Sequence, residues 1–145
     1  MAQFVHLHVH TQYSILDGAA SISSLLARAK QFGMEAVAMT DHGNMYGAKE
    51  FYDSATKAGI KPIIGCEVYM VADRHQKSKE TERRYHLILL AKNSVGYHNL
   101  IKLVSIGFTE GSYYGKPRID HTILQELSEG IICCSACIAG EVPRA

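Results

Sequence analysis

The sequence predicts a single α/β domain in which helices cover a parallel sheet. Strand-like and helix-like segments alternate along most of the 145 residues, and the strand-like segments are almost continuously apolar, as in buried parallel strands. A content of 47% hydrophobic and 20% charged residues is that of a chain with a packed core. These patterns fit a doubly wound sheet or a barrel, and the length fits one ordinary domain.

The first half of the chain begins with a period-two pattern. Residues 4–9 alternate apolar side chains with histidine, which predicts a short strand. Residues 22–31 keep a helical apolar period, with Ser21 or Ser23 as the N-cap and Gly33 just beyond the C-terminus. Three further segments continue the alternation: a buried strand over 35–40, an amphipathic helix over 46–58 and a strand over 61–71.

The second half opens with a densely charged segment. Residues 72–84 have no apolar period, so they are interpreted as a solvated loop or the tip of a hairpin. The remaining predicted elements are a strand over 86–91, a helix over 94–106, a Gly/Tyr-rich turn over 111–117, a short helix over 120–127 and a strand over 130–135.

Composition excludes some classes of function. No apolar run approaches the roughly 20 residues that cross a bilayer, and no signal-peptide pattern opens the chain. Lys and Arg total 15 against 14 Asp and Glu, so any nucleic-acid binding has to be local. The four cysteines are a poor disulfide framework and indicate a reducing, cytoplasmic location: Cys66, Cys133, Cys134 and Cys137.

Histidine is the one compositional excess, and HLHVHT (6–11) concentrates three of them. Side chains alternate along a strand, so His6, His8 and His10 are expected on one face. Neighbouring histidines are then about 6.6 Å apart, which allows His8 and His10 to serve one metal cluster. His6 lies about 13 Å from His10 and is assigned a structural role. The alternative is a strand of satisfied, half-buried histidines.

Other candidate ligands stand where strands end. His42 follows the second predicted strand, and Glu67 lies near the end of the third. Because the carboxyl ends of parallel strands gather on one face, both are expected beside His8 and His10. Asp17 belongs to a loop that would fold over that face, although an Asp-Gly pair is more often a simple turn.

The last two candidates are less specific. His86 heads an apolar strand and needs a partner if it is buried. Cys137 follows the final strand and could add a thiolate, whereas Cys133 and Cys134 are interpreted as core residues. Together these candidates exceed the four ligands of one tetrahedral zinc, which suggests two or three clustered ions of the kind that act on phosphate.

The motifs together resemble the PHP (polymerase and histidinol phosphatase) superfamily. They are LHVHT (7–11), TDHGN (40–44), GCE (65–67), His86 and Cys137. The sequence between the motifs is most similar to the amino-terminal domain of bacterial replicative DNA polymerase III alpha subunits, and the similarity extends from Gln3 onward. The resemblance implies a (βα)7 barrel with its metal site at the C-terminal rim of the strands.

The resemblance also implies a ligand set and an activity. The implied ligands are His8, His10, Asp17, His42, Glu67, His86 and Cys137. Asp41 is implied to support the ligands without binding metal. The implied cofactors are two or three divalent ions, with zinc expected first and manganese or iron as alternatives. The implied activity is a 3′→5′ exonuclease that proofreads.

The chain departs from the family pattern where it stops, at Ala145. The last barrel strands, a late Asp-x-His pair and the polymerase domains are absent, so residues 1–145 are expected to form an incomplete barrel. We expect DNA and other replisome subunits as partners of the full-length polymerase, no membrane contact, and self-association through the open barrel edge.

Two other functions stay open: a separate phosphoesterase for a small monoester such as histidinol phosphate, and a metal-stabilised scaffold without catalysis. Tyr113 and Tyr114 would either stack on a frayed base or pack on the barrel. The charged loop carries five basic residues: Arg74, Lys77, Lys79, Arg83 and Arg84. They would either contact DNA or form a solvated surface together with the acidic residues Asp73, Glu80 and Glu82.

Overall fold

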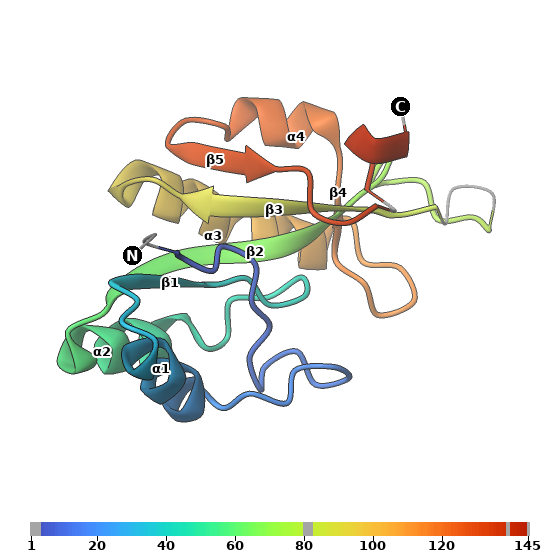
Figure 1. Cartoon of the computed structure of the whole chain (residues 1–145). Helices are drawn as coiled ribbons and strands as arrows, with labels where there is room; N and C mark the ends of the chain where they lie inside the picture. The colour runs from blue at the N-terminus through green and yellow to red at the C-terminus, as the bar shows by residue number, and fades with distance from the viewer. Residues whose placement is uncertain (1–3, 80–82, 139, 145) are drawn as a thin grey trace.

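The computed structural model describes residues 4–79, 83–138 and 140–144, so Glu80 and Glu82 of the charged loop lie outside the described residues. No helix in this part of the chain is long and apolar enough to cross a membrane. The elements, in chain order, are α1 (Ile22–Gln31), β1 (Ala36–Met39), α2 (Ala48–Ala58), β2 (Lys61–Met70), β3 (Tyr85–Ala91), α3 (Ser94–Thr109), β4 (Arg118–Ile119), α4 (His121–Glu126), β5 (Ile131–Cys134) and a 3₁₀ turn (Val142–Arg144) (Figure 1).

The sheet is open and mixed, with the strand order β1-β2-β3-β5 and the short β4 beside the last residues of β2. β1 and β4 run parallel to β2, whereas β3 is antiparallel to both β2 and β5. The predicted all-parallel sheet is therefore wrong. The cause is the connection from β2 to β3, which carries no described helix, so the chain returns as a hairpin. The hairpin interpretation of residues 72–84 is confirmed.

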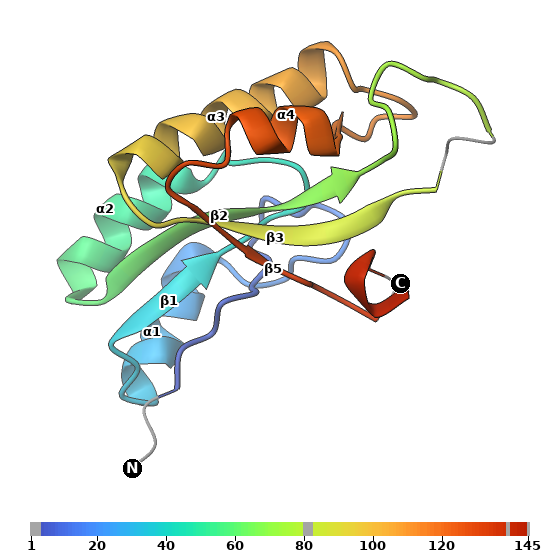
Figure 2. The same cartoon turned by 90° about the horizontal axis from the view of Figure 1, so that it is seen from above.

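The described helices all pack on one face of the sheet. Val37 and Met39 of β1 meet α1 and α2, and Leu87 and Leu89 of β3 meet α3 and α4. Figure 2 shows α3 and α4 lying along one side of β2 and β3. A doubly wound fold covers both faces, so the described elements exclude it. A smaller apolar cluster, around Ala38, Ile88 and Leu90, lies on the opposite face.

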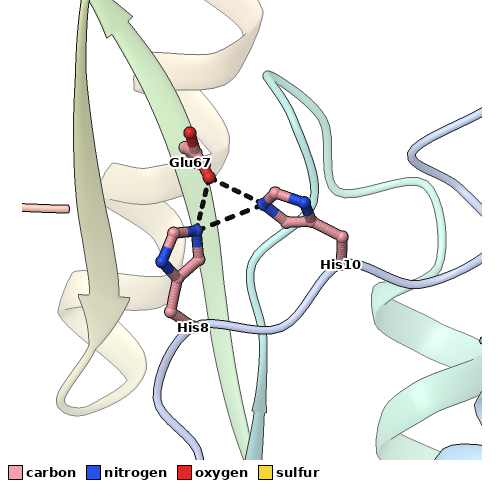
Figure 3. A group of neighbouring side chains, drawn as sticks. All are labelled: His8, His10 and Glu67. Carbon is pink, nitrogen blue, oxygen red and sulfur yellow. Dashed lines mark hydrogen bonds and ion pairs between the residues drawn. The ribbon is translucent and has the colours of Figure 1, made fainter. Parts of the chain in front are cut away.

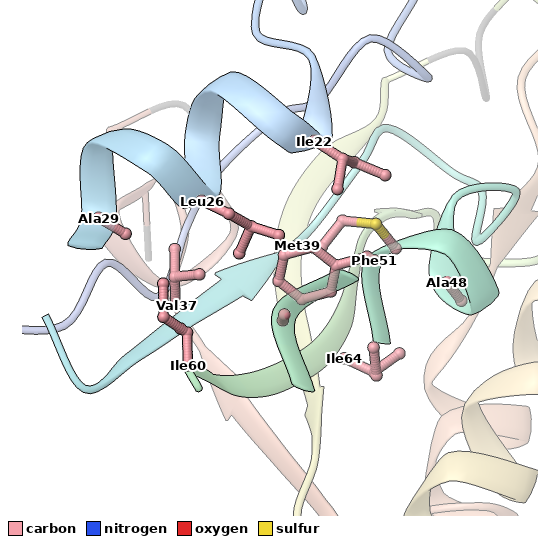
Figure 4. Packing of buried hydrophobic residues seen from close by; sticks show 10 residues of the cluster. Ile22, Leu26, Ala29, Val37, Met39, Ala48, Phe51, Ile60 and Ile64 are labelled. Atoms are coloured by element: carbon pink, nitrogen blue, oxygen red, sulfur yellow. The ribbon is translucent and has the colours of Figure 1, made fainter. Parts of the chain in front are cut away.

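Local sequence explains why these helices form where they do. Ser21 accepts a hydrogen bond from the Ser24 N–H and is confirmed as the N-cap of α1. Asn93 and Asp120 cap α3 and α4 in the same way. The apolar stripes of α1 and α2 then interlock in the cluster of Figure 4, with Phe51 fully buried at its centre.

The segment over residues 4–9 is extended but does not form the predicted regular strand. Its carbonyls at His6 and Val9 accept hydrogen bonds from Ala38 and Thr40 of the β1 region. The Val9 N–H, however, donates to the side-chain oxygen of Thr40, at 2.8 Å. A hydroxyl thus takes the place of a main-chain acceptor, and the ladder is interrupted. The segment still runs alongside β1, which holds its histidines beside the sheet.

The prediction that Cys133 is a core residue is wrong, because its side chain is exposed. β5 lies at one end of the strand order, with β3 as its described partner. An edge strand gains cover from one neighbour only, and Ile132 is exposed there too. Cys134 is half-buried against the small cluster on the opposite face.

A buried polar network fastens the charged loop to β4. Arg118 is fully buried and donates to the carbonyls of Gly111, Arg74 and Gln76. Arg74 pairs with Glu110 at 2.8 Å and with Asp120 at 3.0 Å. Arg74 is therefore engaged within the domain and is not presented to a ligand.

We expect Asp120→Ala to lower the free energy of unfolding by about 2–4 kcal/mol, because it removes the α4 cap and leaves the Arg74 guanidinium without its buried partner. Urea denaturation measures the loss. The control Asp53→Ala removes an exposed carboxylate that pairs with Lys49, and it should cost less than about 1 kcal/mol.

The stability lost in the Asp120→Ala variant should also depend on pH. Burial alone would raise the pKa of Asp120, but hydrogen bonds from the Arg74 and Ile123 N–H groups and from the Arg74 guanidinium hold that pKa below its ordinary value of 3.8. The stabilisation is therefore present above pH 3.8 and is lost as the pH falls through the folded-state pKa. The difference in stability between native protein and variant should shrink on acidification, and a constant difference would contradict the network.

Candidate metal centre

Polar side chains gather at one end of the sheet, on the face opposite the helices. Glu67 projects there from β2, and His42 forms a parallel bridge with it from the turn after β1. His86, the second residue of β3, stands opposite Tyr69 of β2. Because β3 is antiparallel, its first residues lie beside the last residues of β2. The reversed strand thus brings His86 to the end where His42 and Glu67 meet.

Glu67 is the centre of this cluster and is only 2% exposed. Its Oε2 lies 2.5 Å from His8 Nε2 and 2.7 Å from His10 Nε2, and Figure 3 shows both imidazoles turned toward it. Its Oε1 lies 2.6 Å from His86 Nδ1. Three imidazoles from two distant parts of the chain therefore share one carboxylate. The Nε2 atoms of His8 and His10 also lie 3.2 Å from each other.

A second group overlaps the first at His10. Asp17 Oδ2 lies 3.0 Å from His42 Nε2 and 3.5 Å from His10 Nδ1, and the His10 and His42 rings are 4.0 Å apart at their centroids. The ligand atoms within each group lie within 4.8 Å of one another, in the sets His8/His10/Glu67 and His10/Asp17/His42. Six of the seven predicted ligands thus converge.

The electrostatics of the cluster follow from these contacts. Burial alone would raise the pKa of Glu67, but hydrogen bonds to His10, His86 and His8 hold that pKa far below its ordinary value. In return, the hydrogen bond to Glu67 raises the pKa of His10 above its ordinary value of 6.5. Burial acts to raise the pKa of Asp17 too, yet its pKa is lowered, mainly by His42. Both carboxylates are therefore ionised at neutral pH.

The donor atoms fit a divalent cation. Imidazole nitrogens and carboxylate oxygens are ligands of zinc, manganese and iron. Among the described residues, His42 Nδ1 is buried without a hydrogen-bond partner and lies 3.6 Å from Glu67 Oε1. A cation between these groups would give that nitrogen a partner. The cluster can hold a divalent metal ion.

Asp41 supports the cluster from behind. It is fully buried and accepts hydrogen bonds from the Thr11 N–H at 2.6 Å, the Thr11 hydroxyl at 2.7 Å and the Ser14 hydroxyl at 2.7 Å. These bonds tie the loop that carries Asp17 to the end of β1. Neither group of converging ligand atoms in the described residues includes Asp41.

Two other candidates lie apart from the cluster. His6 is exposed and packs edge-on against the Phe4 ring, at 4.7 Å between centroids. Cys137 is half-buried, and its carbonyl accepts a hydrogen bond from the Gly140 N–H. No converging group within residues 4–79, 83–138 and 140–144 contains the Cys137 thiol.

Tyr69 was not predicted from the sequence; its ring stacks on His42, with 6.1 Å between ring centroids, and meets His86 edge-on at 5.2 Å. The missed signal was its position two residues after Glu67, since alternate residues of a strand share a face. Gly43 packs behind this ring: its φ is +64°, and an added Cβ would lie 2.7 Å from Pro117. The turn over 111–117 is therefore held close to the cluster.

Tyr113 and Tyr114 were expected either to stack on a frayed base or to pack on the barrel, and the structure gives a packing contact for Tyr113. The Tyr113 ring packs under the buried Arg118 guanidinium, at 5.0 Å, and meets Tyr114 at 4.5 Å. A cleft opens beside the cluster, and neither tyrosine lines it. The packing alternative for Tyr113 therefore holds.

This fold and this cluster define an α/β domain with a candidate divalent-metal centre at one end of its sheet. The chain belongs to the PHP domain family, whose profile matches residues 6–145. Among curated proteins it is 55% identical to the DNA polymerase III subunit alpha of Borreliella burgdorferi over 146 residues, which are 99% of this chain and 13% of that protein. The Helicobacter pylori subunit is also 55% identical, over 96% of this chain and 11% of its own length. The chain thus spans about an eighth of these relatives.

Two solved structures share part of the fold. One is a Bifidobacterium adolescentis protein assigned as a metal-dependent phosphoesterase, with a TM-score of 0.52 and 22% identity. The other is a Chromobacterium violaceum amidohydrolase with bound sulfate and no metal, with a TM-score of 0.52 and 26% identity. Each comparison covers 72% of this chain and 33% of the other.

We expect the His10 imidazole of the metal-free chain to titrate above 6.5, because its protonated form donates to Glu67. This bond stabilises the folded chain below pH 6.5, and the stabilisation is lost as the pH rises through the His10 pKa. Glu67→Gln should shift the titration back toward 6.5, as NMR of the imidazole nitrogens would show. The control Asp53→Asn should not shift it, and a native His10 that titrates below 6.5 would contradict the geometry.

Proposed function

We propose that this chain is the PHP domain of a bacterial DNA polymerase III alpha subunit and serves DNA replication. The support is the identity of 48–55% to such subunits across 94–99% of the chain. Because the chain spans only a small part of these relatives, polymerisation would belong to other parts of such a protein. DNA and the other replisome subunits are the proposed partners, and the exposed edge strand β5 is the proposed route of self-association.

We propose that residues 1–145 form part of a PHP-type (βα)7 barrel. Two observations support this. The described helices all cover one face of the sheet, as they do on the outside of a barrel. The polar cluster stands at the carboxyl ends of β1 and β2 on the other face, which would be the barrel interior.

The proposed ligands are His8, His10, Asp17, His42, Glu67, His86 and Cys137, holding two or three divalent ions with zinc foremost and manganese or iron as alternatives. Glu67 is suited to bridge two ions, because its two oxygens already face different imidazoles. His10 is suited to bind one ion through one ring nitrogen while the other donates to a carboxylate, because its two ring nitrogens face Glu67 and Asp17. Bound ions would activate water and neutralise charge on a phosphate.

The proposed activity is hydrolysis of phosphodiesters from the 3′ end of DNA, as a proofreading exonuclease. The observation that carries it is the convergence of four imidazoles on a buried, ionised Glu67, with a second carboxylate, Asp17, against two of them. Glu67 orients the histidines, and Asp41 holds the loop that carries Asp17. A small phosphate monoester is the less favoured substrate, because the relatives most like this chain are polymerase subunits.

Metal content tests the ligand assignment. We expect the chain to bind two or more equivalents of divalent metal, measured by elemental mass spectrometry, and His8→Ala/His10→Ala to lose them. The matched control His6→Ala alters a histidine of the same segment that faces Phe4, and it should keep the metal. Equal metal content in all three proteins would refute the site.

Activity tests the reaction. In a full-length polymerase containing this chain, we expect His10→Ala to slow digestion of 3′-labelled single-stranded DNA by more than the roughly 10- to 100-fold that loss of a supporting residue costs. Nucleotide incorporation by the same protein provides the internal control and should be unchanged. A native protein that binds metal but digests no DNA would instead be a metal-stabilised scaffold.

A further inference from the structure

A cleft of about 490 Å³ opens beside the candidate metal centre, within the range of roughly 300–1,000 Å³ that small-ligand sites span. Asp17, His42 and His86 of the cluster form part of its lining. Its lining also includes the cations Lys116 and Arg84, the aromatics Tyr46 and Phe108, and the apolar pair Ile15 and Leu16. None of these six residues belongs to the candidate metal centre.

Both cations line the cleft, and Lys116 stands close to the cluster. Lys116 Nζ lies 3.3 Å from the Tyr69 hydroxyl and 5.2 Å from the centre of its ring, and that ring stacks on His42. Within the described residues, no carboxylate forms an ion pair with Lys116. An ammonium group held by a tyrosine at the mouth of a metal centre is placed to bind a phosphate.

The aromatics form the outer wall. Tyr46 comes from the turn before α2 and Phe108 from the last turn of α3, and their rings lie 6.3 Å apart with an angle of 32° between the planes. Their exposed fractions, 67% and 40%, are high for such large side chains. Ile15 and Leu16, about nine-tenths exposed, add apolar surface from the loop that carries Asp17. Flat apolar surfaces of this kind bind nucleobases by stacking.

We infer that this cleft binds the 3′-terminal nucleotide of single-stranded DNA, with its base on Tyr46 and Phe108 and its phosphate at Lys116 and Arg84. The inference rests on the proposed exonuclease function for the polarity of the strand. It adds a determinant of specificity, because a small phosphate monoester without a base cannot use the aromatic wall. Stacking accepts every base, as a proofreading site requires.

The test compares two labelled oligothymidines that differ only at the 3′ end, where one carries a base and the other an abasic sugar. Fluorescence anisotropy with the 145-residue chain gives both affinities. Each is measured once with zinc and once with EDTA, and the EDTA measurement reports binding without hydrolysis. We expect removal of the base to weaken binding by roughly 5- to 150-fold, the range for one stacked base.

Protein variants complete the thermodynamic cycle. Tyr46→Ala/Phe108→Ala should weaken binding of the intact oligonucleotide by the same factor and leave the abasic one unaffected. The matched control Tyr52→Ala changes an exposed aromatic side chain of α2 outside the cleft, and both affinities should stay unchanged. Lys116→Gln should reduce the salt dependence of binding by about 0.7 in the slope of log affinity against log salt.

Equal affinity for the two oligonucleotides, or losses that simply add, would overturn the inference. The proposed function is tested separately, by hydrolysis of bis(p-nitrophenyl) phosphate with a metal-loaded full-length polymerase that contains this chain. Hydrolysis without base-dependent binding would overturn the cleft assignment alone. Base-dependent binding without hydrolysis would overturn the phosphodiesterase alone.

Discussion

The buried carboxylate of Glu67 constrains the whole arrangement around it. An ionised carboxylate inside a protein is costly unless several partners compensate for the lost water. His8, His10 and His86 provide those partners, and they come from an extended segment before α1 and from the strand after β2. The chain must therefore bring both regions to one end of β2. The apolar packing on the helix face leaves the opposite face free for this purpose.

The local elements could be predicted from sequence, whereas the direction of β3 was predicted wrongly. Caps, apolar periods and glycines mark α1, α2 and β2 within a few residues, because each signal lies inside the element itself. The charged loop did carry a signal for an antiparallel β3, because a segment without an apolar period supplies no crossover helix, but the apolar strands on either side favoured a parallel sheet. Period-two alternation placed His8 and His10 on the same carboxylate, even though Thr40 interrupts the regular strand.

The structure brings the predicted histidines and carboxylates together, whereas several residues around them were not predicted. His42 and Asp17 could be predicted because they are of residue types that bind metals and stand in short sequence motifs. Tyr69, Lys116 and Phe108 come from β2, a turn and the end of α3, and only tertiary packing makes them neighbours of the cluster. Cys137 shows the opposite case, since its residue type suggests a ligand while its thiol belongs to neither converging group of the described residues.

The sequence separation within the cluster has a consequence for how the molecule folds. Glu67 lies 59 residues from His8 and 57 from His10, and closing so long a loop costs entropy before the contact can stabilise anything. His86, in contrast, lies only 19 residues from Glu67, within the β2–β3 ladder. By the same argument we expect Glu67 to meet His86 early, and His8 and His10 after β1, whose paired residues stand 25 positions from those of β2, has joined the sheet. One half of the metal centre thus forms with the sheet, and the N-terminal segment adds the other half.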